Sequence, residues 1–278
     1  IQYPTSGIFK KILLFIKLFK NKYYCIGALD GKKRSIYFTI LLRSKINFLL
    51  TYKKLYKKYL SLLFSFIFVD DENPSKIEEF RKVLNSLKYD FIEEDLNTIK
   101  IIEEPTLSLK LNYNFHNSFN LFHLDEKWFL NSYIKTYHNI EPTFEKLIFF
   151  LKKTIDKTNY DILVSCGELN NKFSNRFKEI LLQVNTNEFQ LEHNNNKIIF
   201  LEKLSFFDLQ YIISKADTFI SCHGAPTHVA SSLKTKIIDI IDVSEKLFFD
   251  KWSAHFRNHK QLNREHFITL SDKIIKML

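Results

Sequence analysis

Glycine, proline and cysteine are all scarce in this chain of 278 residues. Five glycines and five prolines exclude collagen-like and low-complexity architectures, which require far more of both. The three cysteines, Cys25, Cys166 and Cys222, are far apart in the sequence and form no CxxC pair. We therefore expect neither a disulfide framework nor a cysteine metal site, and we expect a reducing compartment.

The sequence also lacks a hydrophobic run long enough to span a membrane. The longest apolar stretch, Leu60–Val69, is interrupted by two serines and is well short of the roughly 20 residues that cross a bilayer. The chain has neither an initiator methionine nor a signal peptide, so we expect residue 1 to be an internal position of a longer protein. We expect the protein to be cytoplasmic.

Acidic residues are almost absent from the first fifth of the chain. Residues 1–58 contain 14 Lys or Arg and a single acid, Asp30, whereas residues 59–278 contain 27 bases and 30 acids. The overall charge of +10 therefore belongs to the N-terminal segment. A nucleic acid, an anionic membrane surface or an acidic acceptor would suit such a segment, and a merely solvated basic face is the remaining interpretation.

Apolar runs of strand length alternate with helix-like segments in the second half, which is typical of a doubly wound parallel sheet. The expected strands are 118–123, 161–166, 197–200, 218–222 and 236–241. We expect one parallel sheet over residues 118–242, with every strand directing its carboxyl end to a common cleft, because ligands bind at that edge of such sheets.

The first half resembles part of another α/β domain. We expect strands at 23–29 and 46–50 and helices at 32–42 and 74–87. The polar stretch Tyr113–Asn117 is the candidate linker, which predicts an N-terminal domain over residues 1–117 and a C-terminal domain over residues 118–278.

The sharpest local pattern is Ile220–Ala230, which reads Ile-Ser-Cys-His-Gly-Ala-Pro-Thr-His-Val-Ala. A strand leads into a turn of small residues and then into a helix that begins near Pro226 or Thr227, where proline suits the first turn. Backbone amides and the positive end of the helix dipole favour an anion there, such as a diphosphate. His223 and His228 flank this turn.

This segment resembles the Asp-Thr-Gly-Pro-Met-His-Leu-Ala motif of bacterial heptosyltransferase-like glycosyltransferases, which holds the phosphates and sugar of the donor. Pro226, His228 and Ala230 match the motif, whereas His223, Gly224 and Ala225 replace its Asp, Thr and Gly.

Further matches to the family lie on both sides of this motif. The segment from Leu204 to Asp217 resembles the family's Leu-Ser helix, and Lys127-Trp128 resembles its phosphate-side lysine segment. Gly167-Glu168 falls where the family has a glycine turn followed by an acidic ribose contact, and Asp30 and Arg34 resemble part of the family's acceptor-side stretch.

The resemblance implies an α/β protein of GT-B architecture, with two Rossmann-like doubly wound domains facing a cleft. The N-terminal domain would lack its first strand-helix-strand unit and the C-terminal helix would cross back. The implied donor-binding residues are Lys127, Gly167, Glu168, His223, Gly224, Ala225, Pro226, Thr227 and His228; Asp30 and Arg34 are implied on the acceptor side. These residues also have a structural interpretation: His228 could simply cap or pack, His223 could be a solvated turn residue and Lys127 could be one of many surface lysines.

The implied reaction is an inverting, metal-independent sugar transfer that needs no cofactor. The donor would be a nucleotide-diphosphate sugar and the acceptor a lipopolysaccharide-type saccharide. The enzyme would act at the inner face of the cytoplasmic membrane. A carboxylate would remove the acceptor proton, and the resemblance places this base upstream of residue 1. The alternative is a non-catalytic α/β protein that binds nucleic acid or membrane through residues 1–58. The glycosyltransferase interpretation includes no nucleic-acid partner.

Overall fold

A computed structural model describes residues 8–29, 32–42, 44–51, 53–69, 75–89, 113, 115, 117–129, 135–166 and 173–278. The chain divides into two compact units, residues 1–90 and 91–278. Tyr113 and Phe115, within the stretch expected to link the domains, pack against the core of the second unit.

The first unit contains a parallel sheet of three strands in the order β1-β2-β3. Its elements are α1 (Ile8–Phe19), β1 (Tyr23–Ala28), α2 (Lys33–Leu41), β2 (Ser44–Thr51), α3 (Lys54–Leu60), β3 (Phe66–Val69) and α4 (Lys76–Ser86). A small core of Ala28, Ile36, Leu49 and Phe64 lies between the sheet and its helices. The alternation of strands and helices expected for this half is confirmed.

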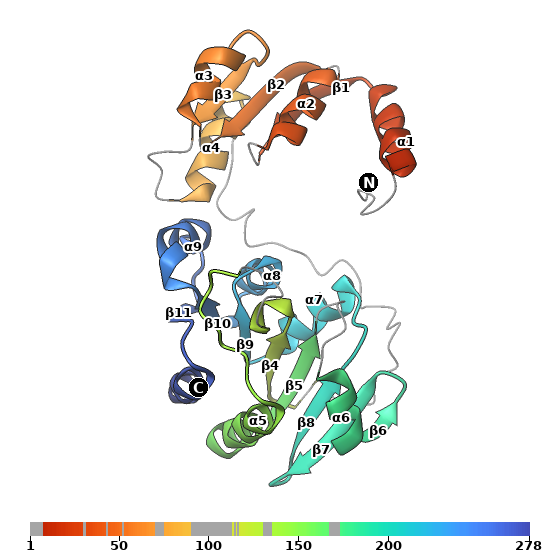
Figure 1. The fold of residues 1–278 in the computed structure, drawn as a ribbon, viewed down its shortest axis with the longest axis vertical. Coiled ribbons are helices and arrows are strands. Elements are labelled where there is room, and N and C mark those ends of the chain that lie inside the picture. The colour runs from red at the N-terminus through yellow and green to blue at the C-terminus, as the bar shows by residue number, and fades with distance from the viewer. Residues whose placement is uncertain are drawn as a thin grey trace. The chain divides into compact units, whose positions relative to one another are not determined.

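The second unit is built on one sheet of eight strands in the order β11-β10-β9-β4-β5-β8-β7-β6 (Figure 1). The strands are β4 (Phe119–Leu124), β5 (Asp161–Cys166), β6 (Leu182–Asn185), β7 (Glu188–His193), β8 (Asn196–Leu201), β9 (Thr218–Cys222), β10 (Lys236–Ile241) and β11 (His259–Asn263). The central strands are buried on both faces, which explains why they read as nearly continuous apolar runs. The predictions for 161–166, 218–222 and 236–241 are confirmed to the residue.

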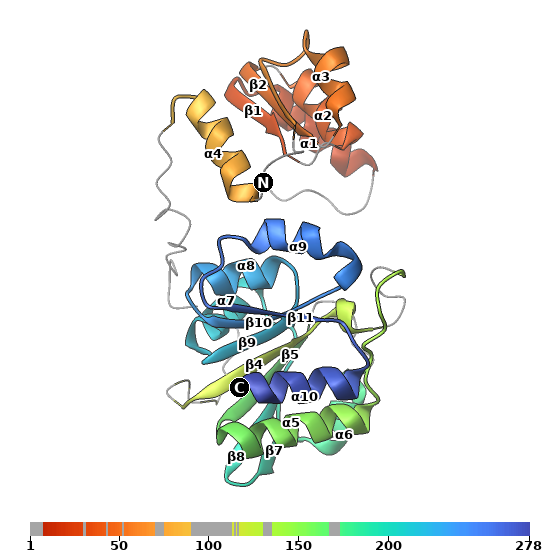
Figure 2. The same ribbon diagram turned by 90° about the vertical axis from the view of Figure 1, so that its left-hand side faces the viewer.

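Helices cover both faces of this sheet, as a doubly wound fold requires. The helical elements are η2 (Glu126–Trp128), α5 (Phe144–Thr158), α6 (Ser174–Ile180), α7 (Phe206–Lys215), α8 (Ala225–Ser232), η3 (Val243–Glu245), α9 (Lys246–Ser253) and α10 (Phe267–Met277). Helices α5, α6 and α10 lie on one face, and α7 and α8 lie on the other (Figure 2). The C-terminal helix α10 packs through Phe267, Leu270 and Ile274 into the core beneath α5.

The prediction of an entirely parallel sheet over residues 118–242 is wrong at one edge. Strand β7 runs antiparallel to both β6 and β8, so two strands are added by hairpins rather than by crossovers. Asn194 and Asn195 connect β7 to β8, with φ values of 49° and 64°. Two consecutive left-handed residues form the type of turn that joins antiparallel strands.

Candidate functional site

The turn between β9 and α8 is closed by its own hydrogen bonds. Gly224 is the N-cap of α8, and the buried Thr227 hydroxyl donates to the Gly224 carbonyl at 2.6 Å and accepts from the Gly224 N–H at 3.2 Å. The Thr227 N–H also donates to the Gly224 carbonyl, at 3.0 Å, and Pro226 has no N–H. The turn thus offers an anion fewer backbone donors than the sequence suggested, and a side-chain cation becomes more important.

Lys127 provides that cation. Strands β4 and β9 are parallel neighbours, so the residues after each strand lie at the same edge of the sheet. A Cβ atom at Gly224 would lie 2.9 Å from the Lys127 ammonium nitrogen and 3.1 Å from its Cε. The lysine side chain therefore lies directly over the glycine, in the space that a larger residue would occupy.

Asp125 holds the Lys127 ammonium in an ion pair. The same carboxylate caps η2 by accepting from the Lys127 N–H at 3.1 Å. Burial acts to lower the pKa of Lys127, but the charge and the hydrogen bond of Asp125, together with smaller contributions from Cys222 and Glu126, outweigh burial and hold the pKa above its usual value. Lys127 is therefore a fixed cation, in contrast to a mobile surface lysine.

Arg264, which was not predicted from the sequence, links three segments next to the site. Its guanidinium donates to the Lys127 carbonyl at 2.7 Å, to the His138 carbonyl at 2.9 Å and to the Cys222 sulfur at 3.5 Å. It therefore joins β11 to η2 and to the end of β9. Nothing in its local sequence distinguishes it, because its role depends on contacts between segments that are far apart in the chain.

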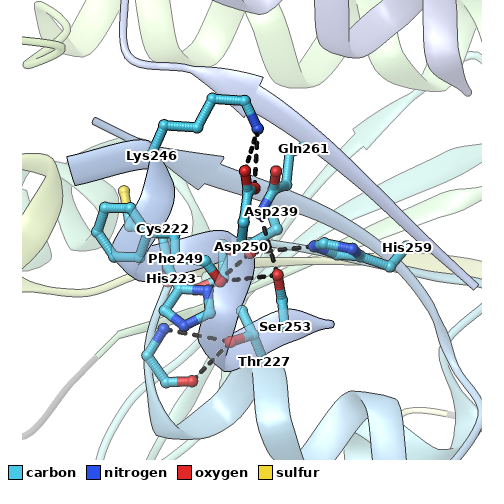
Figure 3. Close-up of polar contacts among 12 residues, drawn as sticks. Cys222, His223, Thr227, Asp239, Lys246, Phe249, Asp250, Ser253, His259 and Gln261 are labelled. Atoms are coloured by element: carbon cyan, nitrogen blue, oxygen red, sulfur yellow. Dashed lines mark hydrogen bonds and ion pairs between the residues drawn. The ribbon is translucent and has the colours of Figure 1, made fainter. Parts of the chain in front are cut away.

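His223 is paired with an acid on the neighbouring strand. Its Nδ1 lies 2.7 Å from Oδ2 of Asp239 in β10, and His259 Nε2 approaches the same oxygen at 3.2 Å from β11 (Figure 3). Asp239 is fully buried. Burial raises the pKa of this carboxyl group, but the two imidazole contacts outweigh that effect and the pKa lies below its ordinary value.

His228, on the first turns of α8, lies among aromatic rings. Its ring centroid is 5.3 Å from that of His223, 4.9 Å from Phe256 and 5.9 Å from the stacked His255. Burial, followed by the nearby His223 and His255, lowers the pKa of His228 from 6.5 to about 4. His228 is therefore neutral near pH 7, and Phe256 of the C-terminal segment packs against it.

The structure brings most of the predicted donor-site residues together. Lys127, His223 and the segment 224–228 lie at the carboxyl ends of β4 and β9. Gly167, Glu168 and Asp30 lie outside the described residues. Arg34 is exposed in the first turn of α2, in the other unit.

Asp239 was also not predicted, although the sequence contains a signal for it. The strand Lys236–Ile241 reads Lys-Ile-Ile-Asp-Ile-Ile, and an acid inside a fully buried apolar strand is rare unless it is paired.

Within the described residues, no group of three or more His, Cys, Asp or Glu side chains is arranged to hold a metal ion.

Comparisons with known proteins find similarity of structure only. No protein-family model matches the chain, and no curated sequence matches it. Among solved structures, E. coli heptosyltransferase WaaC with ADP-2-deoxy-2-fluoro heptose superposes with a TM-score of 0.61 at 12% identity, over 99% of this chain and 79% of that chain.

Two further glycosyltransferase structures match over most of the chain. E. coli ADP-heptose lps heptosyltransferase II gives a TM-score of 0.55 at 11% identity, covering 91% of this chain and 75% of its own. The glycosyl transferase family 9 protein from Veillonella parvula DSM 2008 gives a TM-score of 0.53 at 12% identity, covering 93% of this chain and 68% of its own. This chain therefore has the GT-B α/β fold of the bacterial heptosyltransferases.

Proposed function

We propose that this protein is a glycosyltransferase that moves a sugar from a nucleotide-diphosphate donor to a cell-surface saccharide of the lipopolysaccharide type. The observation that carries the proposal is the position of the Lys127 ammonium directly over Gly224, at the start of α8. A fixed cation and a helix N-terminus at the carboxyl edge of a parallel sheet suit a diphosphate. The fold shared with structures that contain ADP or ADP-2-deoxy-2-fluoro heptose supports an ADP-linked sugar as donor.

In this proposal the diphosphate lies between Lys127 and the turn at Gly224. An ammonium group has three N–H donors, so its ion pair with Asp125 does not exclude a phosphate oxygen. As the bond to the sugar breaks, negative charge grows on the departing diphosphate, and fixed donors around it lower the barrier. Transfer is inverting and metal-independent, with a carboxylate base that removes the proton of the acceptor hydroxyl.

Removing the Lys127 ammonium should weaken ADP binding about tenfold to a hundredfold. A hydrogen bond to a charged group contributes about 1.5–3 kcal/mol, and about 1.4 kcal/mol corresponds to a factor of ten. Lys127→Met alone would leave the buried Asp125 carboxylate without its cation, so the comparison is between Asp125→Asn and the double variant Asp125→Asn/Lys127→Met. Calorimetric titration with ADP and with ADP-heptose measures the difference.

Lys157→Met is the matched control, because this exposed lysine lies on α5, away from the turn. It should bind ADP as the unaltered protein does. Equal affinities in the single and double variants would place the diphosphate elsewhere, and failure of the unaltered protein to bind any nucleotide-diphosphate sugar would overturn the proposed function.

We also propose that the first unit attaches the enzyme to the inner face of the cytoplasmic membrane. Phe15 on the inner side of α1 packs edge-to-face against Phe38 of α2, with ring centroids 5.4 Å apart. Helix α1 also exposes Phe9, Ile12, Leu13, Ile16 and Phe19. Exposed lysines at 17, 20 and 22 lie on or next to the helix, and an apolar stripe flanked by cations suits an anionic lipid surface. None of the helices in the described part of the chain has both the length and the hydropathy that a bilayer-spanning helix needs.

Leu13→Glu should reduce co-sedimentation with vesicles that contain acidic lipid, because it places a negative charge within this stripe. Binding of the unaltered protein should decline as salt rises, since exposed charges are screened over about 8–10 Å at physiological ionic strength. Leu62→Glu is the control, because Leu62 is 97% exposed in the same unit but lies outside α1. Equal binding to neutral vesicles, or salt-sensitive binding to single-stranded RNA without vesicle binding, would contradict the membrane proposal.

A further inference from the structure

Asp239 is an acid in the middle of a buried parallel strand. It has no exposed surface, and its register neighbours are Ser221 in β9 and Gln261 in β11. Burying an ionised carboxylate is costly unless it is paired and hydrogen-bonded. Its place in the strand therefore calls for an explanation beyond the packing of the sheet.

The hydrogen bonds of Asp239 are concentrated on one oxygen. His223 Nδ1 and His259 Nε2 both contact Oδ2, at 2.7 and 3.2 Å, whereas the buried Oδ1 has no hydrogen-bond partner within the described part of the chain. A carboxylate that served only to stabilise the sheet would be expected to use both oxygens, because an unsatisfied buried acceptor is costly. The arrangement instead favours a role directed at the two histidines.

The protonation pattern of His223 follows from its partner. An ionised carboxylate only accepts hydrogen bonds, so the Nδ1 of His223 must carry a hydrogen and donate it to Asp239. In the neutral form of the ring, Nε2 is then an acceptor. No described residue contacts Nε2 within hydrogen-bond distance, and the side chain retains 7% exposure.

The ring of His223 is also held in place by its neighbours. Its centroid is 4.9 Å from that of Phe249 in α9 and 5.3 Å from that of His228 in α8. The other charged or titratable groups nearby are His259 of β11, which shares Asp239, and Lys127, whose ammonium lies over the adjacent Gly224. The imidazole is thus fixed one residue away from the turn assigned to the diphosphate.

We propose that Asp239 is a positioning residue for sugar recognition, which holds His223 so that its Nε2 accepts a hydrogen bond from a hydroxyl group of the donor sugar. This inference rests on the proposed function, because the sugar is covalently linked to the diphosphate bound at Gly224. It also accounts for His223 in place of the acid of the family motif. The carboxylate is that of Asp239 on the neighbouring strand β10, and the imidazole of His223 provides the hydrogen-bond acceptor for the sugar.

Asp239→Leu tests this role, because leucine cannot accept from His223. Affinity for ADP should change less than twofold, whereas affinity for ADP-heptose should fall about tenfold, a factor that corresponds to about 1.4 kcal/mol. Asp239→Asn, whose carbonyl oxygen can still accept from Nδ1, should recover much of that loss. Nitrogen-15 shifts of the His223 ring should show hydrogen on Nδ1 in the unaltered protein and a changed tautomer in Asp239→Leu.

Asp161→Leu is the control for loss of a buried carboxylate. Asp161 begins β5 and accepts from Tyr113 and from the Lys197 N–H, so its variant should lose stability without altering the ratio of ADP-heptose to ADP affinity. An equal loss of both affinities in Asp239→Leu, or no loss of either, would overturn the proposal. The ring shifts need no ligand, so an unchanged tautomer in Asp239→Leu overturns it even if the proposed donor is wrong.

Discussion

Gly224→Val should reduce ADP affinity by about a hundredfold or more, equivalent to about 2.7 kcal/mol. Even the first carbon of a side chain at this position would lie 2.9 Å from the Lys127 ammonium, and valine adds two more. The side chain would displace the ammonium and fill the space proposed for a phosphate oxygen. Backbone strain is not the cause, because φ of 174° and ψ of −169° at Gly224 are extended. Calorimetric titration with ADP measures the loss, and circular dichroism should show the fold retained.

Ser231→Val is the matched control for this variant. It places the same β-branched residue near the other end of α8, where no ligand contact is proposed, so its ADP affinity should be unchanged. Near-normal ADP binding by Gly224→Val would mean that the nucleotide does not approach this turn.

Acidification should destabilise the protein between pH 6.5 and about 4, in part through His228. Burial lowers the pKa of its imidazole to about 4 in the folded state, so over this range the unfolded chain binds a proton that the folded protein does not. Stability from the neutral ring is therefore complete above pH 6.5 and is progressively lost as the pH falls towards 4. The lowering of the His228 pKa from 6.5 to about 4 corresponds to about 3 kcal/mol of stability. Urea denaturation at several pH values measures this change in the free energy of unfolding.

His228→Gln should flatten this part of the pH profile, because glutamine does not titrate. His123 and His255, whose pKa values are also lowered, in both cases mainly by burial, should account for part of the remaining slope. His193→Gln is the control, since that ring contacts Asp156 near the exposed hairpin and lies outside the aromatic cluster. An identical pH profile in His228→Gln would show that the neutral ring contributes nothing to stability.

Much of the second unit could be predicted because buried parallel strands leave a local signal. Apolar runs of five or six residues gave the bounds of β5, β9 and β10, and the Ser205 capping box marked α7, where Ser205 and Asp208 bond each other's backbone N–H. Strands β6 and β7 were not predicted, because polar residues interrupt the apolar pattern; in β7 these include Glu188, Gln190 and Glu192. At an edge, pairing with a neighbouring strand outweighs composition.

The candidate site was predictable only in part, for a similar reason. The turn at 223–228 and Lys127 were found because their types and order resemble a motif. The Asp125–Lys127 ion pair is local, whereas the Arg264 contacts and the pairing of Asp239 with His223 join segments from different strands. Such contacts depend on strand order, which local spacing does not reveal.

The closed turn at Gly224 also has a consequence for the thermodynamics of ligand binding. Thr227 both donates to and accepts from Gly224 within the turn itself, so the conformational entropy of ordering this turn is lost during folding. A ligand that enters a preorganised turn does not have to order it again, and more of its contact energy appears as affinity. The Thr227 hydroxyl thereby contributes to ligand affinity even though it need not contact the ligand.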